Sequence, residues 1–155
     1  MIKIKFVSSD YSKTYIEALN LQLNVHNKDR WEKLKTNSIA SFETCFFRIE
    51  TSKNNYQYYI LNNVFMIYVN NTITINFKNK LTLYTQTNNS SQIKDYTNII
   101  KALKEELRYY NSLNNLNISE VEETKINSLK QKINKYEILN NFSLIKNTKE
   151  TNNEN

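Results

Sequence analysis

The chain has no glycine and no proline in 155 residues, although average usage would supply several of each. Glycine is needed where a backbone approaches a phosphate or takes a positive φ. The absence of glycine therefore excludes the loops of P-loop enzymes, dinucleotide-binding folds and nucleophile elbows. Asparagine is abundant instead, with 27 copies. Because asparagine, lysine, isoleucine and tyrosine use AT-rich codons, the composition indicates an AT-rich genome, such as that of an organelle, virus, plasmid or parasite.

Cysteine and histidine occur once each, as Cys45 and His26. A single cysteine excludes an intramolecular disulfide and a multi-cysteine zinc or iron–sulfur site. Cys45 stands beside Phe46 and Phe47 in a strand-like run, which predicts a small buried side chain rather than a nucleophile. The paired carboxylates lie on charged helix faces, and no spaced acidic loop of the EF-hand kind is present. The sequence therefore predicts no catalytic residue, no metal and no cofactor.

The sequence also lacks a run of about 18 apolar residues and an N-terminal signal segment. It predicts a soluble protein with no membrane span. The expected location is an organelle matrix, such as the mitochondrial one, if the protein is organelle-encoded, and the cytoplasm otherwise. The net charge is +6, and residues 1–90 carry eleven basic and six acidic side chains. That excess suits a polyanionic partner, although a lysine-rich genome by itself also yields a mildly basic protein.

Short alternating segments occupy the chain up to residue 90. Residues 2–7 predict a strand, and residues 11–25 favour a helix, although 18–26 also alternate as a strand would. Residues 28–36 predict a short basic helical turn with Trp31 and Leu34 packed inward. The following alternating segments predict an antiparallel meander of four or five strands, over residues 41–51, 56–61, 64–69, 72–77 and 81–85.

From residue 91 the apolar period changes from 2 to 3.5, as in a coiled coil. Ser119 and Glu122 form a capping box, and the pattern predicts an antiparallel helical hairpin. The fold class is therefore α+β, with a basic β-rich domain at 1–90, the hairpin packing on it at 91–146 and a disordered polar tail at 147–155. The first helix has an apolar seam that either packs on the sheet or docks a partner helix or a second copy of the chain, and it consists of Ile93, Tyr96, Ile100, Leu103, Leu107 and Tyr110.

The aromatic stretch at 42–68 holds the candidate binding surface. Strand alternation assigns one set of side chains to the core, namely Phe47, Tyr59, Phe65 and Ile67. Phe46 falls on the opposite face, where bases could stack beside Arg48 if the C-terminal helices leave that face exposed. The residues predicted to bind RNA come from this face, from the basic 28–35 cluster and from the first strand, and they are Lys3, Lys5, Lys28, Arg30, Lys33, Lys35, Arg48, Lys53, Tyr56 and Tyr58.

The opening segment "MIKIKFVSSDYSKTYIEALNLQL" resembles the start of the universal small-subunit ribosomal protein ten family. Lys3-Ile4-Lys5 matches the family's first strand, Ser8-Ser9-Asp10 its turn and residues 15–23 its amphipathic helix. The resemblance implies a ferredoxin-like β-α-β-β start and binding to ribosomal RNA. The family's Gly-Pro-rich loop and its Arg-Ser-Pro-His signature are absent from this sequence.

These observations predict a non-enzymatic, RNA-associated structural protein, such as a divergent organellar ribosomal protein whose helices contact neighbouring proteins. Two alternatives stay open. A small virus-, phage- or plasmid-encoded protein that binds and inhibits or recruits a host protein would share the composition and the hairpin. A single-stranded nucleic-acid-binding β-barrel would use Tyr56 and Tyr58 for base stacking.

Overall fold

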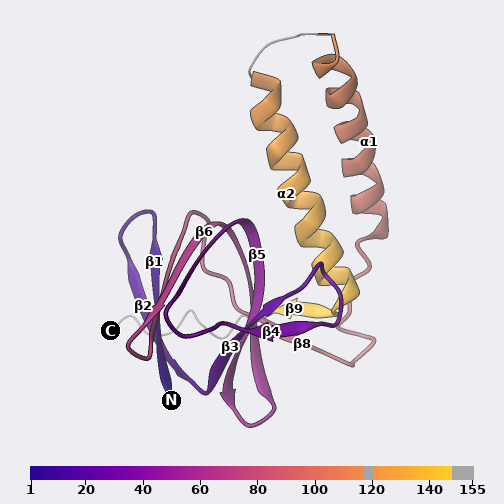
Figure 1. Cartoon of the computed structure of the whole chain (residues 1–155). Coiled ribbons are helices and arrows are strands. Elements are labelled where there is room, and N and C mark those ends of the chain that lie inside the picture. The colour runs from indigo at the N-terminus through magenta and orange to yellow at the C-terminus, as the bar shows by residue number, and fades with distance from the viewer. Residues whose placement is uncertain (117–120, 148–155) are drawn as a thin grey trace, which may run out of the picture. The chain divides into compact units, whose positions relative to one another are not determined.

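The computed structural model describes residues 1–116 and 121–147. The chain divides into two compact units, Met1–Thr85 with Lys146–Asn155 and Gln86–Ile145 (Figure 1). The first unit is built of strands and the second contains two helices, which confirms the α+β class. Within the described residues, no helix is both long enough and apolar enough to cross a membrane.

The first unit is a mixed β-sheet rather than a simple antiparallel meander. Its strands follow the order β2-β1-β7-β6-β5-β3-β4, with β8 paired to β6. The β1–β7 pair is parallel, whereas the other neighbours along this order are antiparallel. The strands are β1 (Ile2–Ser8), β2 (Lys13–Ala18), β3 (Asn20–Asn24), β4 (Trp31–Lys33), β5 (Ser38–Ser52), β6 (Asn55–Val69), β7 (Thr72–Phe77) and β8 (Tyr84–Gln86).

Leu19 closes this sheet into a ring of strands. It is the only residue between β2, which pairs with β1, and β3, which pairs with β5. The Leu19 N–H donates to the Glu50 carbonyl at 2.7 Å. Because β1, β7, β6 and β5 are paired in succession, the bent β2–β3 segment completes a small barrel-like closure.

The expected helix over residues 11–25 is wrong, because β2 and β3 occupy this segment. The helical turn expected at 28–36 is wrong as well, because Trp31–Lys33 form strand β4. Ile16, Ala18, Leu21 and Leu23 alternate with polar residues and pack on the core, so the period of 2 prevails over the helical spacing. The 15–23 helix implied by the ribosomal resemblance is therefore absent, and the ferredoxin-like start is not found.

The core of this unit is rich in aromatic rings. Phe6, Phe47 and Tyr59 are at most 2% exposed. The Phe6 ring centroid lies 5.2 Å from that of Tyr59, and the Phe47 and Tyr59 rings stack at 5.4 Å. The Tyr59 hydroxyl donates to Gln57 Oε1 at 2.9 Å, so its polar end is satisfied while its ring fills the interior.

Asn63 changes which side chains of β6 face the core. The segments expected at 56–61 and 64–69 form one strand, and Asn63 within it has φ 49°. Before Asn63 the odd-numbered Tyr59 and Leu61 point inward, whereas after it the even-numbered Val64 and Met66 do. A left-handed residue turns the chain over, which reverses the alternation.

This reversal corrects the sequence prediction for Phe65 and Ile67. Phe65 is 41% exposed and Ile67 is half-buried, and neither belongs to the buried core cluster. Tyr59, which precedes Asn63 in β6, and Phe47 of β5 are in the core as predicted. The buried position of Cys45 is likewise confirmed.

Asparagine adopts the backbone conformation that glycine usually supplies. Asn54 has φ 62° in the turn between β5 and β6. The β6–β7 loop consists of Asn70 and Asn71, with φ values of 50° and 57°. Positive φ at both central residues is the requirement of a type I′ hairpin, and asparagine tolerates it better than other residues with a Cβ.

The second unit contains α1 (Thr97–Asn114) and α2 (Val121–Asn141), followed by β9 (Leu144–Lys146) at its boundary. The two helices are antiparallel, because Lys104 pairs with Glu137 at 2.7 Å and Lys125 pairs with Glu106 at 3.4 Å. Ser119 lies outside the described residues, as do 148–155 of the predicted tail, and the side chain of Glu122 is not described. The Asn147 N–H donates to the Leu83 carbonyl at 2.9 Å.

The predicted seam forms one side of α1. Tyr96, just before the helix, has its ring 5.1 Å from that of Tyr136 on α2. Lys125 of α2 lies 5.8 Å from the ring centroid of Tyr110. Ile93, ahead of the helix, is 39% exposed. The four seam residues within the helix are half-buried, and they are Ile100, Leu103, Leu107 and Tyr110.

Candidate nucleic-acid interface

The aromatic face singled out in the sequence is largely buried. Phe46 is 5% exposed and Tyr58 is 4% exposed. Their rings stack on each other at 6.3 Å, and the Trp31 ring meets them edge-on at 5.1 Å and 5.9 Å. Phe46 and Tyr58 therefore do not offer an open platform for bases, whereas Tyr56 is half-buried at the rim of the same face.

Arg48 on β5 lies between two aromatic rings of this face. Its guanidinium carbon is 4.3 Å from the Trp31 ring centroid and 4.1 Å from that of Tyr56. Arg48 Nε donates to Gln22 Oε1 at 2.7 Å. Contact with two rings and a hydrogen bond at Nε restrict the orientation of the guanidinium, and arginine favours such cation–π contact.

Lys33 is in the same cross-strand row as Arg48. It is opposite Gln22 in the β3–β4 pair, and Gln22 is opposite Arg48 in the β3–β5 pair. Directly paired residues of neighbouring strands point to the same face, and two strand spacings separate the Cα atoms by roughly 10 Å. We call Lys33, Gln22 and Arg48 with the two flanking rings the Arg48 site.

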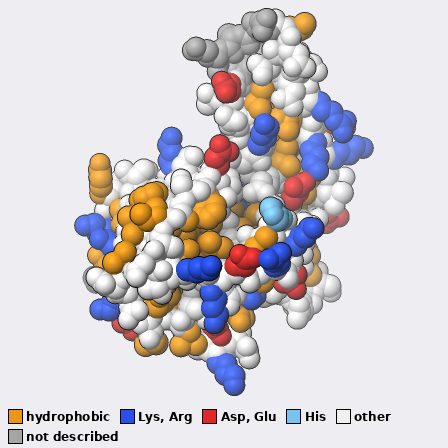
Figure 2. All heavy atoms as spheres, in the orientation of Figure 1, with side chains coloured by type: hydrophobic (Ala, Val, Ile, Leu, Met, Phe, Trp, Pro, Cys, Tyr) orange, Lys and Arg blue, Asp and Glu red, His pale blue; other side chains and the backbone are white. Residues whose placement is uncertain are grey.

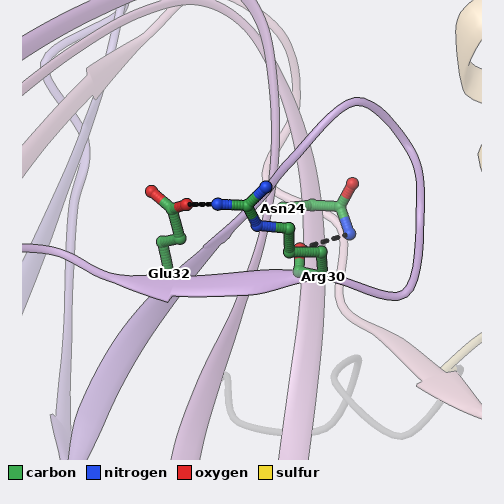
Figure 3. A network of polar contacts seen from close by, with 3 residues as sticks. All are labelled: Asn24, Arg30 and Glu32. Atoms are coloured by element: carbon green, nitrogen blue, oxygen red, sulfur yellow. Dashed lines mark hydrogen bonds and ion pairs between the residues drawn. The ribbon is translucent and has the colours of Figure 1, made fainter.

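The other predicted basic residues of the N-terminal half are dispersed. Arg30 forms an ion pair with Glu32 at 2.8 Å, and Asn24 Nδ2 donates to the Arg30 carbonyl at 3.5 Å (Figure 3). Asn24 Nδ2 also donates to the Lys28 carbonyl at 2.7 Å. The Arg30 charge is therefore locally balanced. Three further side chains are exposed, and these are Lys28, Lys35 and Lys53.

A second surface combines lysine with exposed aromatic rings. Lys5 of β1 is opposite Tyr15 of β2, and Val7 is opposite Lys13. The neighbours of these β1 residues, Ile4 and Phe6, point into the core, so Lys5 and Tyr15 point outward. Tyr15 is 65% exposed.

The outward surface of β1 continues over β7, its parallel neighbour, to β6. Val7 is opposite Asn76 of β7, and Asn76 is opposite Phe65 of β6. We call this surface the β1 face, and it consists of Lys3, Lys5, Lys13, Tyr15 and Phe65. Figure 2 shows hydrophobic and basic side chains side by side at the surface of the β-rich unit.

Tyr15 and Phe65 were missed in the sequence because one was placed in a helix and the other in the core. The strict alternation of Lys13, Tyr15 and Glu17 with Ile16 and Ala18 is the signal that could have revealed Tyr15. Lys3 and Lys5, which were predicted, lie on the β1 face and not with the Arg48 site.

A hydroxyl-rich cavity of about 480 Å³ opens where β1 and β7 end. Asp10 accepts a bond from the Ser8 hydroxyl and one from the Ser12 N–H at 2.9 Å, and these bonds lower its pKa from 3.8 to about 2. Among the described residues no group of three acidic, histidine or cysteine side chains could hold a metal. The cavity is lined by Phe6, Ser8, Ser9, Asp10, Ser12, Thr14, Phe77, Lys78, Asn79, Lys80 and Leu81.

Comparison with protein families adds one relationship. The model of the UU051 N-terminal domain matches residues 1–82, more than half of the chain. The chain belongs to this family. The UU051 N-terminal domain thus includes strands β1 to β7, and with them both the Arg48 site and the β1 face. A search of curated proteins finds no match. The relation to the ribosomal protein ten family stays a prediction.

Proposed function

We propose that this protein is a non-catalytic RNA-binding protein and that the β1 face holds single-stranded RNA. The observation that carries the proposal is Tyr15, which is 65% exposed and lies opposite Lys5. In the rows on either side, Lys13 lies opposite Val7 and Lys3 lies opposite Glu17, whose carboxylate offsets part of the positive charge. An exposed ring among ammonium groups suits a nucleotide, because the ring stacks on the base while the lysines face phosphates.

The expected contributions follow from this small set of groups. Stacking of one base on an aromatic ring contributes roughly 1–3 kcal/mol. Three lysines that neutralise phosphates of a single strand predict a slope of about −2 for log K against log salt. Affinity should therefore be modest at physiological salt and should fall steeply as salt is raised.

The test is fluorescence anisotropy of a labelled 12-nucleotide RNA with the full chain. We expect Tyr15→Ala to weaken binding roughly 5- to 150-fold, which corresponds to the lost stacking. Tyr109→Ala is the matched control, because Tyr109 is 60% exposed but lies on α1 of the other unit. Equal affinities for the two variants would overturn the proposal.

The ribosomal setting is a finer form of the same proposal. An RNA-binding domain with a helical hairpin suits a ribosomal particle, where the helices would contact neighbouring proteins. Co-sedimentation of the protein with ribosomal subunits in a sucrose gradient supports this setting. Finding the protein only in the soluble fractions at low salt counts against the ribosomal setting. RNA binding itself is then decided by the anisotropy test.

A protein partner is the second candidate, and the outward aliphatic side chains favour it. Ile39 is 69% exposed and lies opposite Ile67 in the β5–β6 pair, while Val69 is 44% exposed. Contact between apolar surfaces is not screened by salt, unlike contact with phosphates. Capture of a defined protein that survives nuclease and 1 M salt, and that is lost in Ile39→Lys, would favour this candidate.

A further inference from the structure

We propose that the Arg48 site binds a phosphate monoester group, independently of RNA binding by the β1 face. The group could belong to a free nucleotide or to the terminal phosphate of an RNA, since both present the same dianion. The site is formed by Arg48 and Lys33, with Gln22, Trp31 and Tyr56 holding the guanidinium in place.

The first step is the orientation of Arg48. The guanidinium carbon lies 4.3 Å from the Trp31 ring centroid and 4.1 Å from that of Tyr56, and Nε is used by Gln22. The edge that carries the two Nη groups holds the remaining four N–H donors. Such an edge recognises hydrogen-bond acceptors, in particular the paired oxygens of a phosphate or carboxylate, and not another aromatic ring.

The second step is the charge of the site. In the part of the chain that the structure describes, no carboxylate forms an ion pair with Arg48. Glu50, two residues along β5, is occupied elsewhere: one oxygen accepts from Asn20 Nδ2 and the other from the Asn54 N–H at 3.2 Å. The half-buried Arg48 is thus in no ion pair with a described carboxylate.

The third step selects the ligand class. Lys33 shares the row of Arg48, so two cations face the same space. A phosphate monoester carries about −1.5 to −2 charges at pH 7 and offers three terminal oxygens, which match a bidentate arginine and one ammonium. A single carboxylate carries one charge and two oxygens, and therefore leaves one cation without a partner.

The structure supplies its own probe of this site. Trp31 is the only tryptophan of the chain, and its ring is in contact with the Arg48 guanidinium. Its fluorescence, excited at a wavelength where nucleotides do not absorb, should change as an anion is bound. We would titrate the full chain with uridine 5′-monophosphate, uridine and malonate, which is a dicarboxylate without phosphate.

A saturable change with uridine 5′-monophosphate and none with uridine is expected at pH 7.5. Affinity should fall below about pH 6, where the phosphate dianion takes up a proton and becomes a monoanion. Arg48→Lys, which removes the bidentate edge, should weaken binding at least tenfold. Arg30→Lys is the matched control, because Arg30 is exposed and paired with Glu32, and it should bind as the unchanged protein does.

Lys33→Gln is a second variant that tests the site even if Arg48→Lys fails to fold. Lys33 is exposed, so its replacement leaves the packing of the rings intact. It should weaken binding several-fold. Equal binding of malonate and the nucleotide, or unchanged binding by both Arg48→Lys and Lys33→Gln, would overturn the proposal. Because Trp31 reports a mononucleotide without RNA, these results are separate from the outcome for Tyr15→Ala.

Two RNAs of eight nucleotides then distinguish the sources of the phosphate. If the ligand is an RNA end, a 5′-phosphorylated strand binds more tightly than a 5′-hydroxyl strand, and Arg48→Lys abolishes the difference. If the ligand is a free nucleotide, the mononucleotide binds and the phosphorylation of the strand has no effect. Both outcomes support the phosphate site.

Discussion

Truncation of two phenylalanines tests the reversal of faces at Asn63. Strand alternation in the sequence assigns both Phe47 and Phe65 to the core, whereas the structure buries only Phe47. Phe47 is 0% exposed and Phe65 is 41% exposed. We therefore compare Phe47→Ala with Phe65→Ala, which remove the same atoms from positions that differ in burial.

The expected free energies of unfolding differ by a clear margin. Phe47→Ala removes a fully enclosed ring and leaves a cavity, which costs about 3–5 kcal/mol. Phe65→Ala loses only the partial burial of its ring and opens no enclosed space. Full burial of such a side chain contributes about 1.5–3 kcal/mol, so the cost here is about 1–2 kcal/mol. Met66→Ala, at the buried neighbour, should cost about 2–5 kcal/mol.

The assay is equilibrium unfolding in urea, followed by Trp31 fluorescence. Trp31 belongs to the β-rich unit, so the signal reports the unit that contains all three substitutions. The midpoint at constant slope gives the change in stability. A loss for Phe65→Ala as large as that for Phe47→Ala would refute the reversal and restore the simple alternation of β6.

Three further predictions follow from the same residues and their neighbours. Asn63→Val should destabilise the unit by about 1–2 kcal/mol in the urea assay, because a β-branched residue resists φ 49°, whereas Asn76→Val in the regular strand β7 should change little. Burial raises the pKa of the Cys45 thiol to about 12, so it should react with a thiol reagent at pH 8 only when urea unfolds the chain; equal rates with and without urea would contradict this. The folded pKa of Asp10 is about 2 against 3.8, so its stabilisation is present above pH 3.8 and is lost as the pH falls through about 2; urea midpoints measured from pH 5 to 2 should vary less in Asp10→Asn.

Much of the fold could be predicted because alternation is a local signal. The strand at 2–7, the strand at 72–77 and the helical seam at residues 96–110 depend on spacing within one segment, and the structure contains all three. The β2–β3 segment was harder, because Tyr15, Ala18 and Leu19 also satisfy a helical spacing. Its outcome depends on pairing with β1 and with β5, the second of which is distant in sequence.

The candidate sites likewise contain residues that local sequence predicts and residues that it does not. Arg48 and Tyr56 could be named from their aromatic and basic surroundings, but the role of Trp31 depends on β4 pairing with β3, which no local pattern reveals. Phe65 was assigned to the wrong face because one left-handed asparagine reverses every later side chain of β6. An asparagine pair in this chain forms a turn at 70–71 and lies inside a strand at 62–63, and the two cases look alike in sequence.

The parallel β1–β7 pair has a consequence for how the chain is made. Lys3 is opposite Thr72 and Ser8 is opposite Phe77, so β1 pairs on one edge with a strand that is synthesised about 70 residues later. During translation β1 can pair with β2 early, but its other edge and the Ile4 and Phe6 side chains wait for β7. Contacts of such sequence separation slow folding. A ribosome paused before residue 72 would therefore hold a nascent chain whose ring of strands is still open, and in which Ile4 and Phe6 are accessible to chaperones.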